Sequence, residues 1–212
     1  FTQSAAVWSA AAAERARWRG LAVFAVDGTT LRVPDTAEND AAFGRPGARG
    51  GRAAGYPQLR LVALMLLGHP LLTALAVGPY TQSEVPLATP LWPVLPDASI
   101  VLFDRGFGAY ALLHQLGDGT RQRHWLTRAK EAPKALQMQP HEQLGPNDHL
   151  VDLVPSPPLR QHHPHLPATL RVRAIRYRRP GFRPQMLLTS MLDPVVFPAA
   201  DVKFFLSASE ET

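Results

Sequence analysis

Two aspartates stand out because each follows a wholly apolar run and is followed closely by glycine. Asp27 ends the run at residues 21–26, and Asp104 ends the run at residues 100–103. Apolar runs without a polar break are typical of strands buried on both faces of a sheet. An acidic residue where such a strand ends is costly to hold in a core without a partner. Because the pattern occurs twice, both aspartates are candidates for chemistry.

The two aspartates can meet only if their strands are neighbours in one sheet, since they are far apart in the sequence. In open α/β sheets, functional sites collect at the carboxyl ends of adjacent strands. Two carboxylates brought together there repel each other unless a cation lies between them, and ligand sets made of oxygen favour Mg²⁺ or Mn²⁺. The pattern therefore suggests a divalent-metal site for phosphoryl transfer at Asp27 and Asp104. Two unrelated aspartates in turns are the alternative.

Basic residues that could contact phosphate groups gather in several parts of the sequence. The loop at residues 34–55 is rich in glycine and carries spaced arginines, whose guanidinium groups bind oxygens bidentately. A predicted strand at residues 123–128 ends in basic residues, and alternation at residues 171–176 projects arginines from one face of another strand. Ordinary solvated loops and strand faces are the alternative. The predicted nucleic-acid contacts are Arg45, Arg49, Arg52, Arg105, Arg128, Lys130, Arg171, Arg173, Arg176 and Arg178.

Three histidines, His162, His163 and His165, invite a metal-site interpretation. Two prolines flank them and no fourth ligand stands at a fixed spacing, so an exposed loop is the favoured interpretation.

Composition limits the class of protein. The 212 residues are enough for one domain, or one domain with an insertion. The net charge of +5 and the pI of about 10.1 favour a polyanionic partner such as nucleic acid. The absence of cysteine excludes disulfides and thiolate metal sites and agrees with a cytoplasmic location.

Membrane insertion and secretion are not expected from the sequence. No apolar stretch reaches the roughly 18 to 20 residues needed to span a bilayer, and no basic segment precedes an apolar core at the N-terminus. The chain begins with Phe1 rather than methionine, which suggests a fragment.

The elements that must position the two aspartates follow from apolar patterning and from glycine and proline positions. A helix is predicted at residues 2–19, ahead of the first aspartate strand, and a helix at 106–116 follows the second aspartate. After residue 131, proline clusters alternate with short β-type runs. The predicted strands are residues 21–26, 31–33, 58–67, 71–77, 100–103, 123–128, 150–154, 170–177 and 185–191, with a turn at 28–30 between the first two and a helical stretch inside 81–95.

Several blocks of the sequence, in the same order, resemble the catalytic domain of bacterial insertion-sequence transposases of the DDE class, in their fourth (IS-four) family. The blocks around the aspartates read Val-Asp-Gly-Thr-Thr at residues 26–30 and Leu-Phe-Asp-Arg-Gly-Phe at residues 102–107. The others are Pro-Asp-Thr at 34–36 with Asn39 and Phe43-Gly44, the segment 56–64, Ser83-Glu84, the segment 125–130, and the tail blocks at 187–194 and 197–200.

The resemblance implies an α/β fold, a ribonuclease-H-like mixed sheet flanked by helices, with a β-rich insertion after the third core strand pair. It implies that Asp27 and Asp104 are the first two of three carboxylates that bind two Mg²⁺ (or Mn²⁺) ions. The implied chemistry is DNA strand nicking at the ends of the element, then attack of the freed 3′-hydroxyl on target DNA. The implied partners are transposon-end and target DNA and a second copy in a homodimer, and the implied location is cytoplasmic and nucleoid-associated.

The chain departs from the family pattern at its C-terminal end. There the family carries a glutamate on a helix, in a pattern of Tyr, two residues, Arg, three residues, Glu, six residues, Lys. Residues 203–212 lack this pattern, and Glu210 and Glu211 are the nearby carboxylates. A truncated or frameshifted copy with weak or no activity is therefore expected. Its predicted parts are an N-terminal helical remnant at 1–20, a catalytic core at 21–130, a β-rich insertion at 131–196 and an aberrant tail at 197–212.

Two other functions remain open at this point. One is a DNA-binding or dimerising remnant without catalysis, and the other is a related metal-dependent nuclease that cuts DNA without strand transfer.

Overall fold

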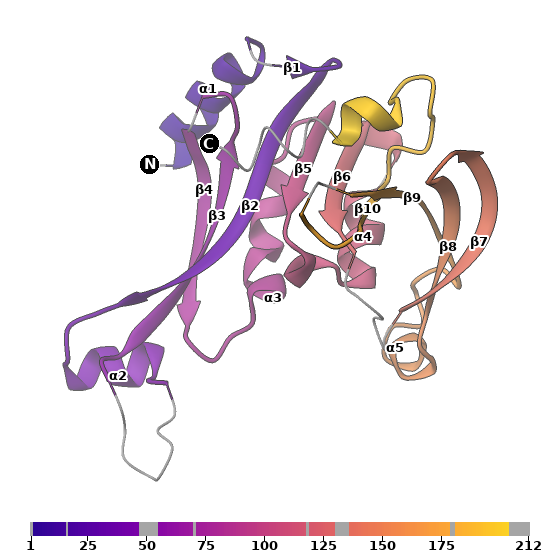
Figure 1. The fold of residues 1–212 in the computed structure, drawn as a ribbon. Helices are drawn as coiled ribbons and strands as arrows, with labels where there is room; N and C mark the ends of the chain where they lie inside the picture. The colour runs from indigo at the N-terminus through magenta and orange to yellow at the C-terminus, as the bar shows by residue number, and fades with distance from the viewer. Residues whose placement is uncertain are drawn as a thin grey trace. The chain divides into compact units, whose positions relative to one another are not determined.

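A computed structural model describes residues 2–15, 17–46, 55–69, 71–117, 119–129, 136–178 and 181–203. The chain divides into two compact units, residues 1–99 and residues 100–212. Figure 1 shows the elements of both, and each unit is described by itself below.

The sheet of the first unit is antiparallel and centres on a long strand, β2 (Leu21–Arg32). β3 (Gln58–Leu66) pairs with β2, and β4 (Leu71–Pro79) pairs with β3. The short strand β1 (Arg17–Trp18) pairs with the other end of β2 through a two-residue turn. Arg19 and Gly20 in that turn have φ angles of 49° and 80°, as the tight hairpin turn of type I′ requires.

The predicted turn at residues 28–30, between two separate strands, is wrong. β2 continues through it and pairs with β3 from Phe24, opposite Leu66, to Arg32, opposite Gln58. The continuous ladder satisfies the backbone there, and the β-branched pair Thr29-Thr30 suits an extended chain.

Helices cover one face of this sheet. α3 (Glu84–Ala88) and the 3₁₀ helix η1 (Thr89–Val94) bury Leu87 and Trp92. The side chain of Leu87 lies 3.0 Å from where a Cβ on Gly78 would be. Gly78 pairs with Arg60 in β3, so α3 lies on the face that carries Arg60.

The remaining helices of the first unit differ from the sequence predictions. α1 (Thr2–Ala13) stops before β1, which shortens the helix predicted at residues 2–19. α2 (Ala37–Phe43) lies in the stretch predicted as a loop, where the Thr36 hydroxyl accepts a hydrogen bond from the amide of Asn39. Such side-chain caps stabilise a helix N-terminus.

The sheet in the described part of the second unit has the strand order β5 (Ser99–Phe103), β6 (Arg123–Arg128), β10 (Gln185–Thr189), β9 (Leu170–Tyr177), β8 (Asp148–Pro155) and β7 (Leu136–Gly145). The pairs from β6 to β7 are antiparallel, whereas β5 and β6 run in the same direction in Figure 1. The sheet is therefore mixed, and the β-type runs predicted after residue 131 are present, with β7 in addition.

The described part of the second unit also contains the short helices η2 (Arg105–Phe107), α4 (Tyr110–Leu116), η3 (Gly119–Arg121) and α5 (Pro157–His162), and a helical stretch at residues 199–203. Its core contains the buried residues Phe103, Phe107 and Trp125. The indole Nε1 of Trp125 donates to the carbonyl of Leu113 at 3.0 Å, which ties α4 to β6. Within the described ranges, no helix is long and apolar enough to cross a membrane.

Candidate active site and nucleic-acid surface

Asp27 lies where β2 passes from buried to exposed. The strand is buried over residues 21–24, and from Asp27 onward its residues are exposed or half-buried. The Gly28 amide donates to the Asp27 Oδ1 at 2.8 Å. Asp27 pairs in register with Ala63, and the alternation of a strand points its side chain away from the face used by its neighbour Gly28. The buried half of the strand thus presents an exposed carboxylate held by one backbone amide.

Asp104 has the same arrangement in the second unit. All five residues of β5 are buried, and Asp104 follows directly and is exposed. Its Oδ1 accepts a hydrogen bond from the Gly106 amide at 2.5 Å. A Cβ at position 106 would lie 2.6 Å from that oxygen, so glycine is needed for this close approach.

Asp27 belongs to the first unit and Asp104 to the second, so the meeting of the two carboxylates stays a prediction. Each uses one oxygen in its amide hydrogen bond, and its second oxygen has no partner among the described residues. Exposed carboxylate oxygens of this kind suit Mg²⁺ or Mn²⁺. No group of three or more candidate ligands is found in the part of the chain that the structure describes. Glu210 and Glu211 lie outside that part.

Arg45 is already engaged by carboxylates of its own unit. It forms ion pairs with Asp35 at 2.5 Å and Asp40 at 2.9 Å, and donates to the carbonyl of Gly55 at 3.0 Å. The Asp35 carboxylate, followed by that of Asp40, raises the pKa of Arg45. Arg45 therefore ties α2 to its flanking segments, and a phosphate would have to compete with two carboxylates. Arg49 and Arg52 lie outside the described residues.

Arg173 was predicted to contact nucleic acid, but the structure places it in the core. Its side chain is 0% exposed and binds Asp148 with two hydrogen bonds, at 2.7 and 2.6 Å. It also donates to the carbonyls of Phe197 at 2.6 Å and Met191 at 3.4 Å. A buried arginine with these partners cannot contact DNA in the folded chain, so its predicted role is wrong.

The prediction that all arginines of this strand share one face is also wrong, because strand side chains alternate. Arg171 and Arg173 share one face, and Arg176 points to the other. Arg171 is exposed and bonds to both oxygens of Asp152, at 3.0 and 3.2 Å. This contact lowers the pKa of Asp152.

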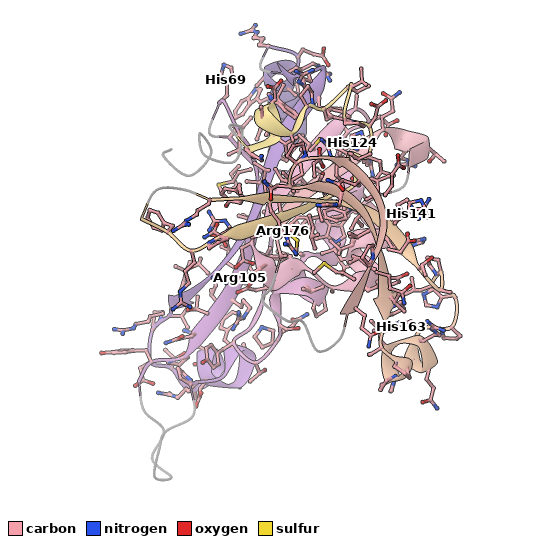
Figure 2. All side chains as sticks on the ribbon, turned by 45° about the vertical axis from the view of Figure 1, so that its right-hand side comes forward. His69, Arg105, His124, His141, His163 and Arg176 are labelled. Atoms are coloured by element: carbon pink, nitrogen blue, oxygen red, sulfur yellow. The ribbon has the colours of Figure 1, made fainter. Side chains whose placement is uncertain are left out.

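The remaining predicted arginine contacts of the second unit lie at one end of its sheet. Arg128 ends β6 beside Leu187 at the start of β10, while Arg176 and Arg178 lie at the end of β9 that pairs with the same part of β10. Arg105 follows β5, the strand next to β6. Arg105 and Arg176 can be followed in Figure 2. Arg105, Arg176 and Arg178 are exposed and Arg128 is half-buried; Lys130 lies outside the described residues.

The three histidines were predicted to lie in a loop, but the first of them belongs to α5. His162 ends α5, and its Nδ1 lies 2.7 Å from the carbonyl of Pro158. His163 and His165 follow the helix, with ring centroids 5.8 Å apart.

His124 is a titratable residue that the sequence did not single out. Its ring contacts Phe197 edge-on, with centroids 5.3 Å apart, and no described hydrogen-bond partner reaches its buried Nδ1. Burial lowers the pKa of His124, against a smaller opposing effect of the Ser190 backbone. The residue is labelled in Figure 2.

Glu84 and Arg60 form an ion pair that the sequence did not predict. The Arg60 Nη1 donates to the Glu84 Oε1 at 2.7 Å, and both side chains are largely buried. Glu84 stood in a block that resembles the family, but nothing in the sequence linked it to Arg60.

A solved structure with a related outline is the piggyBac transposase synaptic complex with hairpin DNA. The likeness covers 81% of this chain and 34% of that chain, with 11% identity and a TM-score of 0.45.

Two relatives found by sequence share more identical residues with the chain. The chain is 37% identical over 202 residues to transposase InsG for insertion sequence element IS4 from Escherichia coli K12, covering 95% of this chain and 44% of the relative. It is 42% identical over 112 residues to the putative transposase InsZ of the same organism, covering 53% of this chain and 38% of the relative. The chain thus spans less than half the length of these relatives.

The family model described as a transposase DDE domain matches residues 18–204, which include both aspartates and their strands. The resemblance seen in the sequence is confirmed by this match and by the two relatives. The chain therefore belongs to the transposase DDE domain family, within its IS4 group.

Proposed function

We propose that the chain is the catalytic core of a DNA transposase that cleaves strands at insertion-sequence ends and transfers them to target DNA. The observation that carries this is the repeated arrangement at Asp27 and Asp104. In each, a buried run of strand residues leads to an exposed carboxylate held by one nearby backbone amide. The ribonuclease-H-like fold is part of the proposal. It is supported by the antiparallel strands β2 to β4 and by the chain order in which α4 connects β5 to β6.

Asp27 and Asp104 are the residues that would hold Mg²⁺ or Mn²⁺. When bound, the ions would activate the attacking oxygen and stabilise the charge that develops on the phosphate. The Gly28 and Gly106 amides fix the orientation of the two carboxylates. Fixed carboxylates are an advantage because less ordering is needed when the site is loaded.

Four arginines of the second unit, exposed or half-buried, supply the proposed DNA contacts. Arg105, Arg128, Arg176 and Arg178 lie at the end of the sheet where Asp104 follows β5. Contacts from arginine to phosphate position the DNA without reading its sequence. The net charge of +5 supports the same partner, and a cytoplasmic, nucleoid-associated location and a homodimer follow from the proposal.

The test is Mn²⁺-dependent nicking of supercoiled plasmid by the purified 212-residue chain. Asp27→Asn and Asp104→Asn keep the side-chain shape and remove the charge, and Glu14→Gln serves as a control at an exposed residue. We expect both aspartate variants to lose nicking and the control to keep it. Equal nicking by all variants would contradict the proposal.

If the folded native chain does not nick the plasmid, calorimetric titration with Mn²⁺ tests the metal site directly. Binding that disappears in both aspartate variants supports the metal site, and no binding by the native chain rejects it. Joining of cleaved 3′ ends to a second DNA separates a transposase from a nuclease that only cuts.

DNA binding without cleavage is the second candidate, favoured by arginines whose contacts need no metal. It predicts that Asp104→Asn binds duplex DNA as tightly as the native chain, with affinity that falls as salt rises. Salt-independent binding would remove this candidate.

A further inference from the structure

We propose that Glu84, held by Arg60, is a positioning residue that sets the Asp27 carboxylate through the backbone of Gly28. We call the Arg60–Glu84 ion pair the buttress. The inference rests on the proposed function, because it gives the buttress a role at the metal site that Asp27 is proposed to form.

The buttress is fixed from two sides. The Arg60 Nη1 donates to the Glu84 Oε1 at 2.7 Å, and the Nη2 donates to the carbonyl of Tyr80 at 3.3 Å. The guanidinium carbon also lies 5.8 Å from the centroid of the Tyr80 ring. The side chains of Arg60 and Glu84 are 21% and 30% exposed. The partial burial of the pair opposes its separation, because each charge is less well solvated here than in water.

Glu84 lies directly against Gly28. A Cβ built on Gly28 would lie 2.6 Å from the Glu84 Cδ and 2.8 Å from both its Cγ and its Oε1. Gly28 pairs with Val62, two residues along β3 from Arg60 and therefore on the same face of that strand. The carboxylate of Glu84 thus occupies the space that any side chain at position 28 would need.

Gly28 in turn holds Asp27. Its amide donates to the Asp27 Oδ1 at 2.8 Å, so the residue pressed by Glu84 also orients the carboxylate. Alternation along β2 points Asp27 to the opposite face from Glu84. Glu84 therefore acts through the backbone and is no ligand for a metal at Asp27.

The experiment follows the Gly28 amide proton by NMR, and Mn²⁺ affinity by titration, in the 212-residue chain. Glu84→Ala removes the buttress, and Glu14→Ala is the matched control, because Glu14 pairs with Arg17 at an exposed position of the same unit. We expect Glu84→Ala to move the Gly28 amide resonance and to weaken Mn²⁺ binding by about 10-fold or more, the range seen when groups behind metal ligands are lost. The control should change neither.

Glu84→Gln tests whether a conservative change preserves the effect. Glutamine fills the same space and keeps an oxygen that accepts from Arg60, so we expect the Gly28 resonance and the Mn²⁺ affinity to stay near native. An unchanged Gly28 resonance in Glu84→Ala, with the fold intact by circular dichroism, would overturn the inference.

Asp27→Asn distinguishes failure of this inference from failure of the proposed function. If that variant binds Mn²⁺ as tightly as the native chain, the proposed metal site is wrong, and the Gly28 resonance in Glu84→Ala still decides the inference.

A second pair of variants tests the packing directly. Gly28→Ala should displace Glu84 and weaken Mn²⁺ binding, while Gly28→Ala combined with Glu84→Ala should bind no more weakly than Glu84→Ala alone. Losses that add in the double variant would mean that the two residues act independently, and would overturn the inference.

Discussion

Two arginine–carboxylate pairs on one face of the β8–β9 ladder differ in what lies over them. Arg171 and Asp152 pair on the exposed surface, whereas Arg173 and Asp148 are 0% and 5% exposed. Both arginines belong to one face of β9. The difference arises from the segment after β10, whose Met191 and Phe197 carbonyls accept from Arg173. An arginine in a basic strand is therefore a surface group or a core group according to a distant segment.

The largest expected effect comes from breaking the buried pair. Arg173→Ala leaves the Asp148 carboxylate and two carbonyls without their donor, and loss of one partner of a buried pair costs about 3 to 5 kcal/mol. We expect a strongly lowered urea midpoint, or failure to fold. Replacing both partners by apolar residues should cost less than the single change. A single change with almost no effect would contradict the buried pair.

His124 extends the comparison to a half-buried histidine whose Nδ1 has no hydrogen-bond partner among the described residues. Burial lowers the pKa of His124 below its ordinary value of 6.5, so the unfolded chain binds a proton more readily than the folded chain. The contribution of His124 to the free energy of unfolding is therefore fully present above about pH 6.5. It is lost as the pH falls through the lower pKa of His124 in the folded chain. His124→Phe should remove this part of the pH dependence in urea titrations at pH 5 and pH 8. The same acid dependence in both proteins would be the contrary result.

DNA binding should sharpen the contrast between exposed and buried arginines. Arg176→Ala should weaken duplex binding and lower the slope of log affinity against log salt by about 0.9, the value for one phosphate contact. Arg173→Met combined with Asp148→Leu, if folded, should leave the slope unchanged. Equal slope changes in both proteins would show that Arg173 reaches the DNA.

The smallest effect is expected at the surface pair. Arg171→Ala should change stability by less than about 1 kcal/mol, because exposed ion pairs contribute little and are screened by salt. The measurement is the urea midpoint at low and high salt. A loss of stability as large as that of Arg173→Ala would mean that the surface pair and the buried pair contribute equally.

Local patterns in the sequence were sufficient to predict the strands that lead to the two aspartates. The runs before Asp27 and Asp104 are apolar throughout, and both form buried strand segments followed directly by an exposed carboxylate. These features depend on neighbours in the sequence, so a short window contains the information. The meeting of the two carboxylates depends on strand order and remains a prediction.

Features that depend on distant segments could not be predicted. Nothing around Arg173 indicates that Phe197 covers it, and nothing around Gly28 indicates that Glu84 lies against it. The continuation of β2 past Gly28 was missed for the same reason, because its pairing with β3 outweighs the local turn preference of Asp-Gly.

The hydrogen bonds of Arg173 also set an order of assembly for the second unit. Its donors join Asp148 on β8 to the carbonyls of Met191 and Phe197, so the segment after β10 can dock only on a ladder that has already formed. That segment should therefore be the last part to become protected from proteases during refolding, and the first to open as the unit loosens.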